Sequence, residues 1–145
     1  MKKMKLAVLA LVGVLAAGNA MAAGSTDVEV SATVLGTCAF GATSYPMAFG
    51  SFNGTDTGPK TATANVQFTC TNNTVYTLDD VSGAQAMTHE TLAETLAYNI
   101  AAYTLSDTAD GTLTTVAIVG TIAQAAYQAA SAGLYEDTLT ININP

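Results

Sequence analysis

Apolar and polar residues alternate along several stretches of this chain with a period of two, which is typical of β-strands. The first such stretch is residues 27–34. In an extended chain its apolar side chains share one face: Val28, Val30, Ala32 and Val34. By periodicity alone, this stretch would be an ordinary first strand of its own domain.

The clearest strand inside the domain is predicted over residues 62–70, where alternate apolar positions end in Cys70. Further strands are predicted at 75–78, 96–105 and 113–122. In the last stretch, residues 135–145, one face carries Leu139, Ile141 and Ile143. By sequence order this terminal strand lacks a following strand that would cover its open side.

Four stretches break the strand pattern. Residues 45–52 mix strand-forming residues with breakers, and the composition of residues 53–59 predicts a loop. Residues 84–95 show little alternation and could hold a loop or a helical turn. Residues 123–130 have a helix-favouring composition but lie between two predicted strands, so that helix and loop both stay open. Short strands separated by turns predict an all-β sandwich.

The first 22 residues have the pattern of a secretory signal peptide. Lys2, Lys3 and Lys5 precede an uncharged apolar run at 6–17, which ends before Ala20-Met21-Ala22. The run is too short to span a bilayer, and no later run approaches that length. We therefore expect an exported protein whose mature chain, from about residue 23, has no membrane-spanning segment and forms one domain.

Charge and cysteine content narrow the class of protein further. After the signal peptide the chain holds one basic side chain, Lys60, against eleven carboxylates, which makes nucleic acid and anionic membranes poor partners. Cys38 and Cys70 are the only cysteines, and in an oxidising compartment they are expected to form one disulfide. Such a bond would stabilise the fold by roughly 3–4 kcal/mol.

No pattern in the sequence indicates an enzyme. The carboxylate pairs Asp79-Asp80 and Glu136-Asp137 are interpreted as solvated strand edges, and His89, the only histidine, as a surface residue. Neither a glycine-rich phosphate loop nor a nucleophile motif is present. We therefore expect no catalytic, cofactor-binding or metal site, and no cofactor.

Five motifs follow one another in an order and spacing that suggest a known family. They are Gly36-Thr37-Cys38, residues 49–52, residues 66–70, residues 96–100 and the ending 133–141 with its glycine-x-tyrosine-x-aspartate-threonine pattern. Together they resemble the spore coat protein U domain, and the major pilins of archaic chaperone-usher pili that carry it, over essentially the whole mature chain. One departure is the terminal Pro145, where many relatives end in an aromatic residue.

The resemblance implies an incomplete immunoglobulin-like β-sandwich that is completed by donor-strand exchange. Residues 23–37 would be the donor strand and a short linker, and residues 38–145 the pilin domain. The donor side chains would be Val28, Val30, Ala32 and Val34. The acceptor groove of the neighbouring copy would include Leu139, Ile141 and Ile143.

The function that the resemblance implies is that of a non-enzymatic major pilin that polymerises head to tail with itself. Its other partners would be a periplasmic pilus chaperone, an outer-membrane usher and minor or tip pilins. The route would lead through the periplasm of a Gram-negative bacterium to a pilus on the cell surface that supports adhesion and biofilm formation. Two alternatives stay open: a secreted spore or cell-surface coat protein, and a monomeric adhesive binding module.

Overall fold

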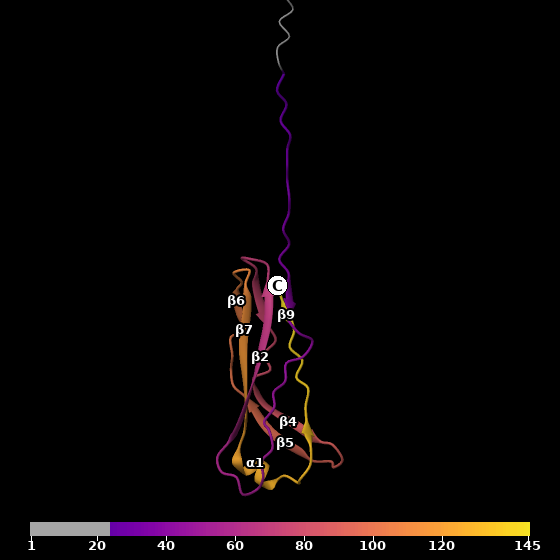
Figure 1. The fold of residues 1–145 in the computed structure, drawn as a ribbon, viewed down its shortest axis with the longest axis vertical. Helices are drawn as coiled ribbons and strands as arrows, with labels where there is room; N and C mark the ends of the chain where they lie inside the picture. The colour runs from indigo at the N-terminus through magenta and orange to yellow at the C-terminus, as the bar shows by residue number, and fades with distance from the viewer. Residues whose placement is uncertain (1–23) are drawn as a thin grey trace, which may run out of the picture. The chain divides into compact units, whose positions relative to one another are not determined.

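The computed structural model describes residues 24–145, so the predicted signal peptide lies outside the described residues. Residues 24–37 contain no helix or strand, although alternation predicted a strand over 27–34. A β-strand needs a hydrogen-bonded neighbour, and no strand ladder among the described residues includes this stretch. It forms the indigo part of the chain in Figure 1.

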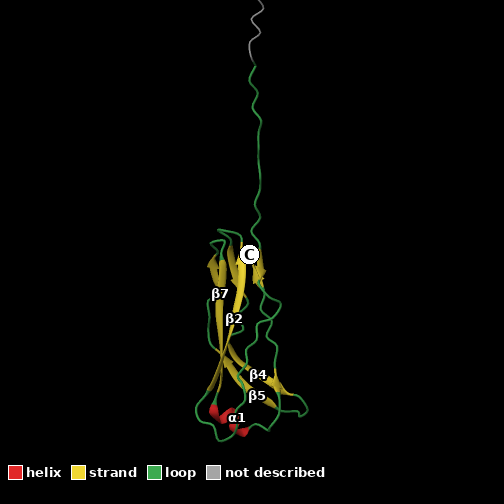
Figure 2. Ribbon diagram, viewed as in Figure 1, coloured by secondary structure: helices red, strands yellow, loops and turns green. Residues whose placement is uncertain are grey.

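The described part of the domain contains nine strands and one short helix. The elements are β1 (Cys38–Phe40), β2 (Lys60–Cys70), β3 (Val75–Leu78), β4 (Gly83–His89), β5 (Thr95–Ile100), β6 (Ser106–Thr108), β7 (Leu113–Ile122), α1 (Gln124–Ala129), β8 (Tyr135–Glu136) and β9 (Ile143–Asn144). Figure 2 shows that long loops join these strands. The chain is therefore all-β, as the sequence predicted.

The larger sheet is antiparallel, with the strand order β1-β2-β7-β5-β4-β8. β2 and β7 pair along nearly their whole length, from Lys60 opposite Ile122 to Thr69 opposite Leu113. β5 joins β7 only where Asn99 and Ile100 meet Thr121 and Gly120, so the sheet curls at this point. As a result, β4 and β5 lie near α1 in Figure 1, while β6 and β9 lie at the other end of the domain.

The smaller sheet, with the order β6-β3-β9, packs on the larger one to form the core of an immunoglobulin-like sandwich. Alternate residues of the longer strands point inward, and the most deeply buried side chains are Phe68, Ile100, Ile118 and Ile122. Phe68 of the larger sheet meets Tyr76 of the smaller one edge to face, with ring centroids 4.9 Å apart. The core thus lies between the two sheets.

The predicted disulfide between Cys38 and Cys70 is present. The two cysteines stand directly opposite each other in the β1–β2 ladder, with their Cα atoms 4.0 Å apart. Beside them the Thr71 amide donates to the Thr37 carbonyl over 2.9 Å. Together, these contacts fix the start of β1 to the end of β2.

The strands predicted at 62–70, 75–78 and 113–122 are confirmed, whereas the one over 96–105 ends at Ile100 and the one over 135–145 is limited to β8 and β9. Two ambiguous stretches are now assigned. Residues 83–89 form β4 and are neither a loop nor a helical turn; two of its three exposed positions are alanines and the inward Gln85 is polar, which hides the alternation. Residues 124–129 form α1, as their local composition favours, and Tyr127 is the residue that the helix buries. Among residues 24–145, no helix is both long and apolar enough to cross a membrane.

Candidate functional site

An open groove of about 1320 Å³ runs along the domain between two chain segments. One wall is formed by residues 42–54 and the other by residues 130–141. The floor consists of inward side chains of the larger sheet: Ala64, Val66, Met87, Leu96, Tyr98, Ile118 and Ile122. Small-molecule pockets measure roughly 300–1,000 Å³, so that the size and the two long walls suit an extended peptide better.

The first wall has the side-chain alternation of a strand but no strand partner. Tyr45, Met47 and Phe49 are half-buried against the core, and the residues between them are exposed. Gly50, with φ 76°, takes a conformation that favours glycine, and Phe52 is the next residue to turn inward. In the described part of the chain, the main chain of residues 43–52 makes no hydrogen bond, which leaves one edge of the groove open for pairing.

The second wall leaves β4 after β8 and reaches β3 only at β9. Between them Leu139 and Ile141 line the groove, whereas Ile143 lies in β9 opposite Leu78 of β3. The main chain of residues 139–141 makes no hydrogen bond within the described chain. Asn142 is held by Asp79, whose carboxylate accepts from its side-chain amide over 2.6 Å. Asp79 is therefore part of a tertiary contact and not only a solvated edge.

Asp137 holds the second wall to the groove floor. Its Oδ2 accepts a hydrogen bond of 2.6 Å from the hydroxyl of Tyr98, whose ring meets Phe49 of the first wall at 5.9 Å. Burial, together with the hydrogen bond and the negative charge of Asp137, holds the pKa of Tyr98 well above its ordinary value. The sequence pattern predicts only a solvated edge for Asp137, because neither alternation nor spacing reveals a partner 39 residues away.

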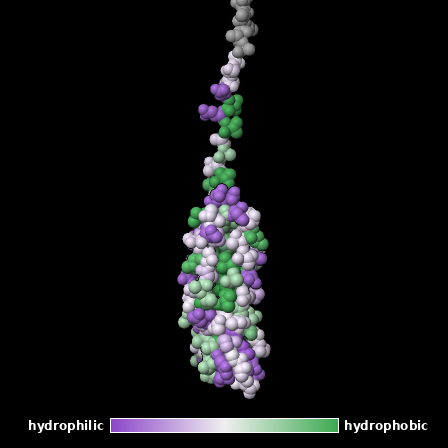
Figure 3. Space-filling view, turned by 90° about the vertical axis from the view of Figure 1, so that its left-hand side faces the viewer, coloured by the Kyte–Doolittle hydropathy of each residue, from purple (hydrophilic) through white to green (hydrophobic). Residues whose placement is uncertain are grey.

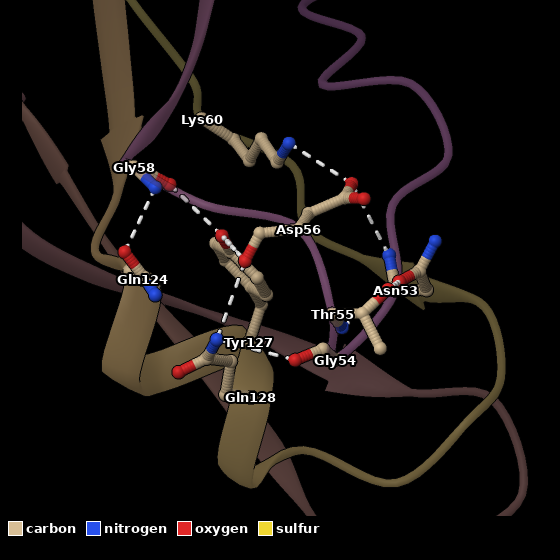
Figure 4. A network of polar contacts seen from close by, with 9 residues as sticks. All are labelled: Asn53, Gly54, Thr55, Asp56, Gly58, Lys60, Gln124, Tyr127 and Gln128. Atoms are coloured by element: carbon tan, nitrogen blue, oxygen red, sulfur yellow. Dashed lines mark hydrogen bonds and ion pairs between the residues drawn. The ribbon is translucent and has the colours of Figure 1, made fainter.

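Figure 4 shows a polar network that joins α1 to the loop 53–59, and Gly54 and Tyr127 of this network line the groove. Tyr127 of α1 donates its hydroxyl to the Gly58 carbonyl over 2.9 Å, and the Gln124 side chain accepts from the Gly58 amide over 2.8 Å. In the same loop Lys60 pairs with Asp56 over 3.0 Å, and this hydrogen bond lowers the pKa of Asp56. The helix that the sequence left open thus anchors the loop 53–59 where it borders the groove.

His89, which the sequence placed on the surface, is buried, with 6% of its area exposed. The prediction was wrong because the ring fills a space behind residues 131–135 of the second wall, a contact that no local pattern reveals. The ring of Tyr135 stands edge to face against the imidazole at 4.9 Å. The region around His89 therefore supports the wall from behind.

The residues predicted to donate a strand are exposed. The exposed fractions are 80% for Val28, 89% for Val30 and 81% for Val34, and Ala32 is exposed as well. In Figure 3, hydrophobic atoms gather on one side of the segment that precedes the domain and hydrophilic atoms on the other. Isolated exposed valines are ordinary, but an alternating row of them is a typical mark of a surface that binds a partner.

Acidic, histidine and cysteine side chains do not gather into a potential metal site. Among residues 24–145, no group of three or more of them lies close enough together to hold an ion. The chemistry of the groove is that of apolar side chains, tyrosine hydroxyls and free main-chain groups. It is suited to binding an alternating β-strand.

Comparison with known families agrees with this geometry. The model of the Spore Coat Protein U domain matches residues 25–142, which include the exposed valines as well as both walls of the groove. The comparison with curated proteins gives no match. Since the family model covers most of the sequence, the chain belongs to the Spore Coat Protein U domain family.

Proposed function

We propose that this protein is the major structural subunit of an extracellular chaperone-usher pilus, in which the leading segment of one copy inserts into the groove of the next. The observation that carries the proposal is the groove itself, with an apolar floor and an unpaired main chain at residues 43–52 of the first wall and 139–141 of the second. A strand inserted there would pair with both walls and bury alternate side chains. Its own residues 28–34 have this alternation.

Length and chemistry support the match between the two parts. Val28 to Val34 and Tyr135 to Ile141 each span six residue steps, or about 20 Å in extended chain. Burying three valines and an alanine would contribute on the order of 5 kcal/mol before main-chain hydrogen bonds are counted. Donor and groove lie on the same chain but would meet between copies, so the contact is head to tail and generates a filament.

The other proposed partners would protect the groove, because an empty groove is unfavourable for a subunit that has not yet assembled. An apolar groove with unpaired main chain favours aggregation, so a subunit in transit needs a strand lent by another protein. We assign this role to a periplasmic chaperone, with an outer-membrane usher as the assembly site and minor pilins at the tip. The route would cross the periplasm of a Gram-negative bacterium, and the pilus would serve adhesion and biofilm formation.

The test compares substitutions on the two faces of the donor segment. Val30→Ser with Val34→Ser should abolish filaments in electron micrographs of material sheared from producing cells, while the chaperone complex still forms. The control, Glu29→Gln with Thr33→Ser, changes the opposite face and should leave filaments intact. Normal filaments from the valine variant, or from a chain without residues 23–34, would refute donor-strand exchange.

A second candidate is a coat protein that packs on a cell or spore surface without a chaperone and usher, and the family description favours it. The two functions differ in what assembly requires. If the secreted protein forms its surface layer in cells that lack any periplasmic pilus chaperone, the coat function holds. If it accumulates only with such a chaperone, the pilus function holds.

A further inference from the structure

His89 is the one buried residue of the polar and charged class among residues 24–145, and the strand-exchange function makes no use of it. It is the last residue of β4, and both of its ring nitrogens have partners. Nδ1 lies 3.1 Å from the amide nitrogens of Thr91 and Leu92, which can only donate. Nε2 lies 3.2 Å from the Ala132 carbonyl oxygen, which can only accept. These partners define a neutral imidazole with its proton on Nε2.

The hydrogen bond from Nε2 reaches the second wall of the groove. Ala132, Gly133 and Tyr135 all line the groove, and His89 lies behind them. Gly133 packs against the ring so closely that a Cβ there would come within 2.6 Å of Cε1. The wall is therefore held in place by a ring that depends on one protonation state.

Carboxylates are the charged groups around this ring. Glu94 accepts from the Ser131 hydroxyl over 3.0 Å and from the Tyr135 hydroxyl over 3.2 Å. Its hydrogen bonds to Ser131, with a smaller effect of His89, lower the pKa of Glu94, and burial beside Glu94 raises the pKa of Tyr135. Glu90 and Glu136, on the loop after β4 and on β8, are exposed. Lys60, the only lysine or arginine of residues 24–145, is paired with Asp56.

Nδ1 now accepts from two amide N–H groups. If Nδ1 took up a proton, its own N–H would point at these two donors. The ring would have to turn away, toward the carboxylate of Glu94, and both amides as well as the Ala132 carbonyl would lose their partner. The new contact with Glu94 offsets part of this loss, and a net loss equivalent to one or two hydrogen bonds weakens the local structure about tenfold. Protonation and an ordered wall are thus mutually opposed.

We propose that His89 is a positioning residue for the groove, and that proton uptake at Nδ1 loosens residues 131–136, so that the groove holds an inserted strand less firmly in mild acid. The second half rests on the proposed strand-exchange function; the loosening of the wall does not. The chain has one histidine, so replacing His89 isolates the effect of this ring. Glu94 adds to the effect only at lower pH, because a carboxylate with a lowered pKa loses its contribution as the pH falls through that value.

The test compares the wild-type chain with His89→Gln, whose amide offers one acceptor and one donor but does not titrate. Amide hydrogen exchange of residues 131–136, corrected for the intrinsic effect of pH, reports the wall directly. From about pH 7.5 to about pH 5.5 we expect protection to fall about tenfold in the wild type and to change little in His89→Gln. Equal pH dependence in both proteins, or none in the wild type, would overturn the proposal.

A labelled peptide with the sequence of residues 24–37 tests the second half on the same samples. Its dissociation from the wild type should accelerate about tenfold over the same pH range, and its dissociation from His89→Gln should not. A peptide that binds equally at both pH values would overturn the effect on the groove. If the peptide binds at neither pH, the proposed strand-exchange function is refuted instead. The amide hydrogen exchange measurement then still tests whether proton uptake loosens residues 131–136.

A measurement on the wild type alone covers the case in which His89→Gln does not fold. Nitrogen NMR shifts should identify the Nε2–H tautomer at neutral pH. As the ring takes up its proton, the amides of Thr91, Leu92 and residues 131–136 should shift with the same midpoint. A ring that titrates without these amides, or that starts in the other tautomer, would refute the proposal.

Discussion

The imidazole of His89 packs directly against the main chain of Gly133, with no room for a side chain between them. The two residues come from segments 44 positions apart, and Gly133 opens the glycine-x-tyrosine-x-aspartate-threonine pattern of the terminal region. The glycine is therefore required for the close approach of the groove wall to the ring.

Gly133→Ala should destabilise the domain by about 1–3 kcal/mol, since the added methyl would overlap the imidazole and push the wall outward. Thermal or denaturant unfolding measures the loss. Gly54→Ala is the control, because a Cβ at Gly54 meets nothing within 4 Å. An unchanged midpoint for Gly133→Ala would contradict the tight packing.

Gly120→Ala should impair strand binding more than folding. A Cβ at this buried position of β7 would come within 2.7 Å of the Met47 sulfur and 2.8 Å of Phe49 Cζ. Both side chains belong to the first wall, and we expect them to shift into the space that an incoming strand needs. Binding of the peptide 24–37 should weaken, and Gly54→Ala again serves as the control. Peptide binding equal to that of the wild type would contradict the expected shift.

Asp137→Ala should cost about 1–2 kcal/mol, because the Tyr98 hydroxyl would lose its partner inside the groove. In a double-mutant cycle with Tyr98→Phe, the two losses should be clearly less than additive. Glu136→Gln, at the exposed neighbouring position, should change stability by less than about 0.5 kcal/mol. Additive losses would mean that the hydrogen bond contributes nothing.

Stability should fall on the alkaline side above about pH 10. Burial raises the pKa of Tyr76, Tyr98, Tyr103 and Tyr135. When the pKa of a group is higher in the folded than in the unfolded state, the group contributes its full stabilisation below the unfolded-state pKa. This contribution is lost as the pH rises toward the folded-state pKa. Chemical unfolding across this range should show the decrease in the free energy of unfolding. The decrease should be smaller in Tyr98→Phe than in the wild type. Equal slopes in both proteins would contradict the effect of Tyr98.

At the α1 end of the groove, Tyr127→Phe should destabilise more than Lys60→Gln. The Tyr127 hydroxyl is the donor to the Gly58 carbonyl from a buried ring, and its loss should cost about 1 kcal/mol. The side chains of the Lys60–Asp56 pair are partly exposed, at 25% and 30%, and ion pairs that solvent can reach contribute little. When unfolding is measured in about 0.5 M salt, the contribution of Lys60 to stability should be smaller still, and that of Tyr127 should be unchanged.

The sequence predicted those elements in which the local pattern of apolar and polar residues matches the burial of the side chains. Val66 and Phe68 alternate with polar neighbours, so the sequence predicts β2 directly, and two cysteines in a chain predicted to be exported leave one possible disulfide. Residues 45–52 were harder, since apolar residues look the same in a groove wall as in a paired strand. The roles of His89 and Asp137 depend on partners 43 and 39 residues away, which no local pattern specifies.

The Cys38–Cys70 disulfide has a mechanical consequence. In a filament of the proposed kind, tension would enter each domain through the segment that precedes Cys38. β1 alone has three paired residues and could be peeled away, but the covalent bond passes the load to the end of β2. β2 is paired with β7 over ten positions and would have to be sheared along its length. The disulfide would then decide how much force a filament bears before its subunits yield.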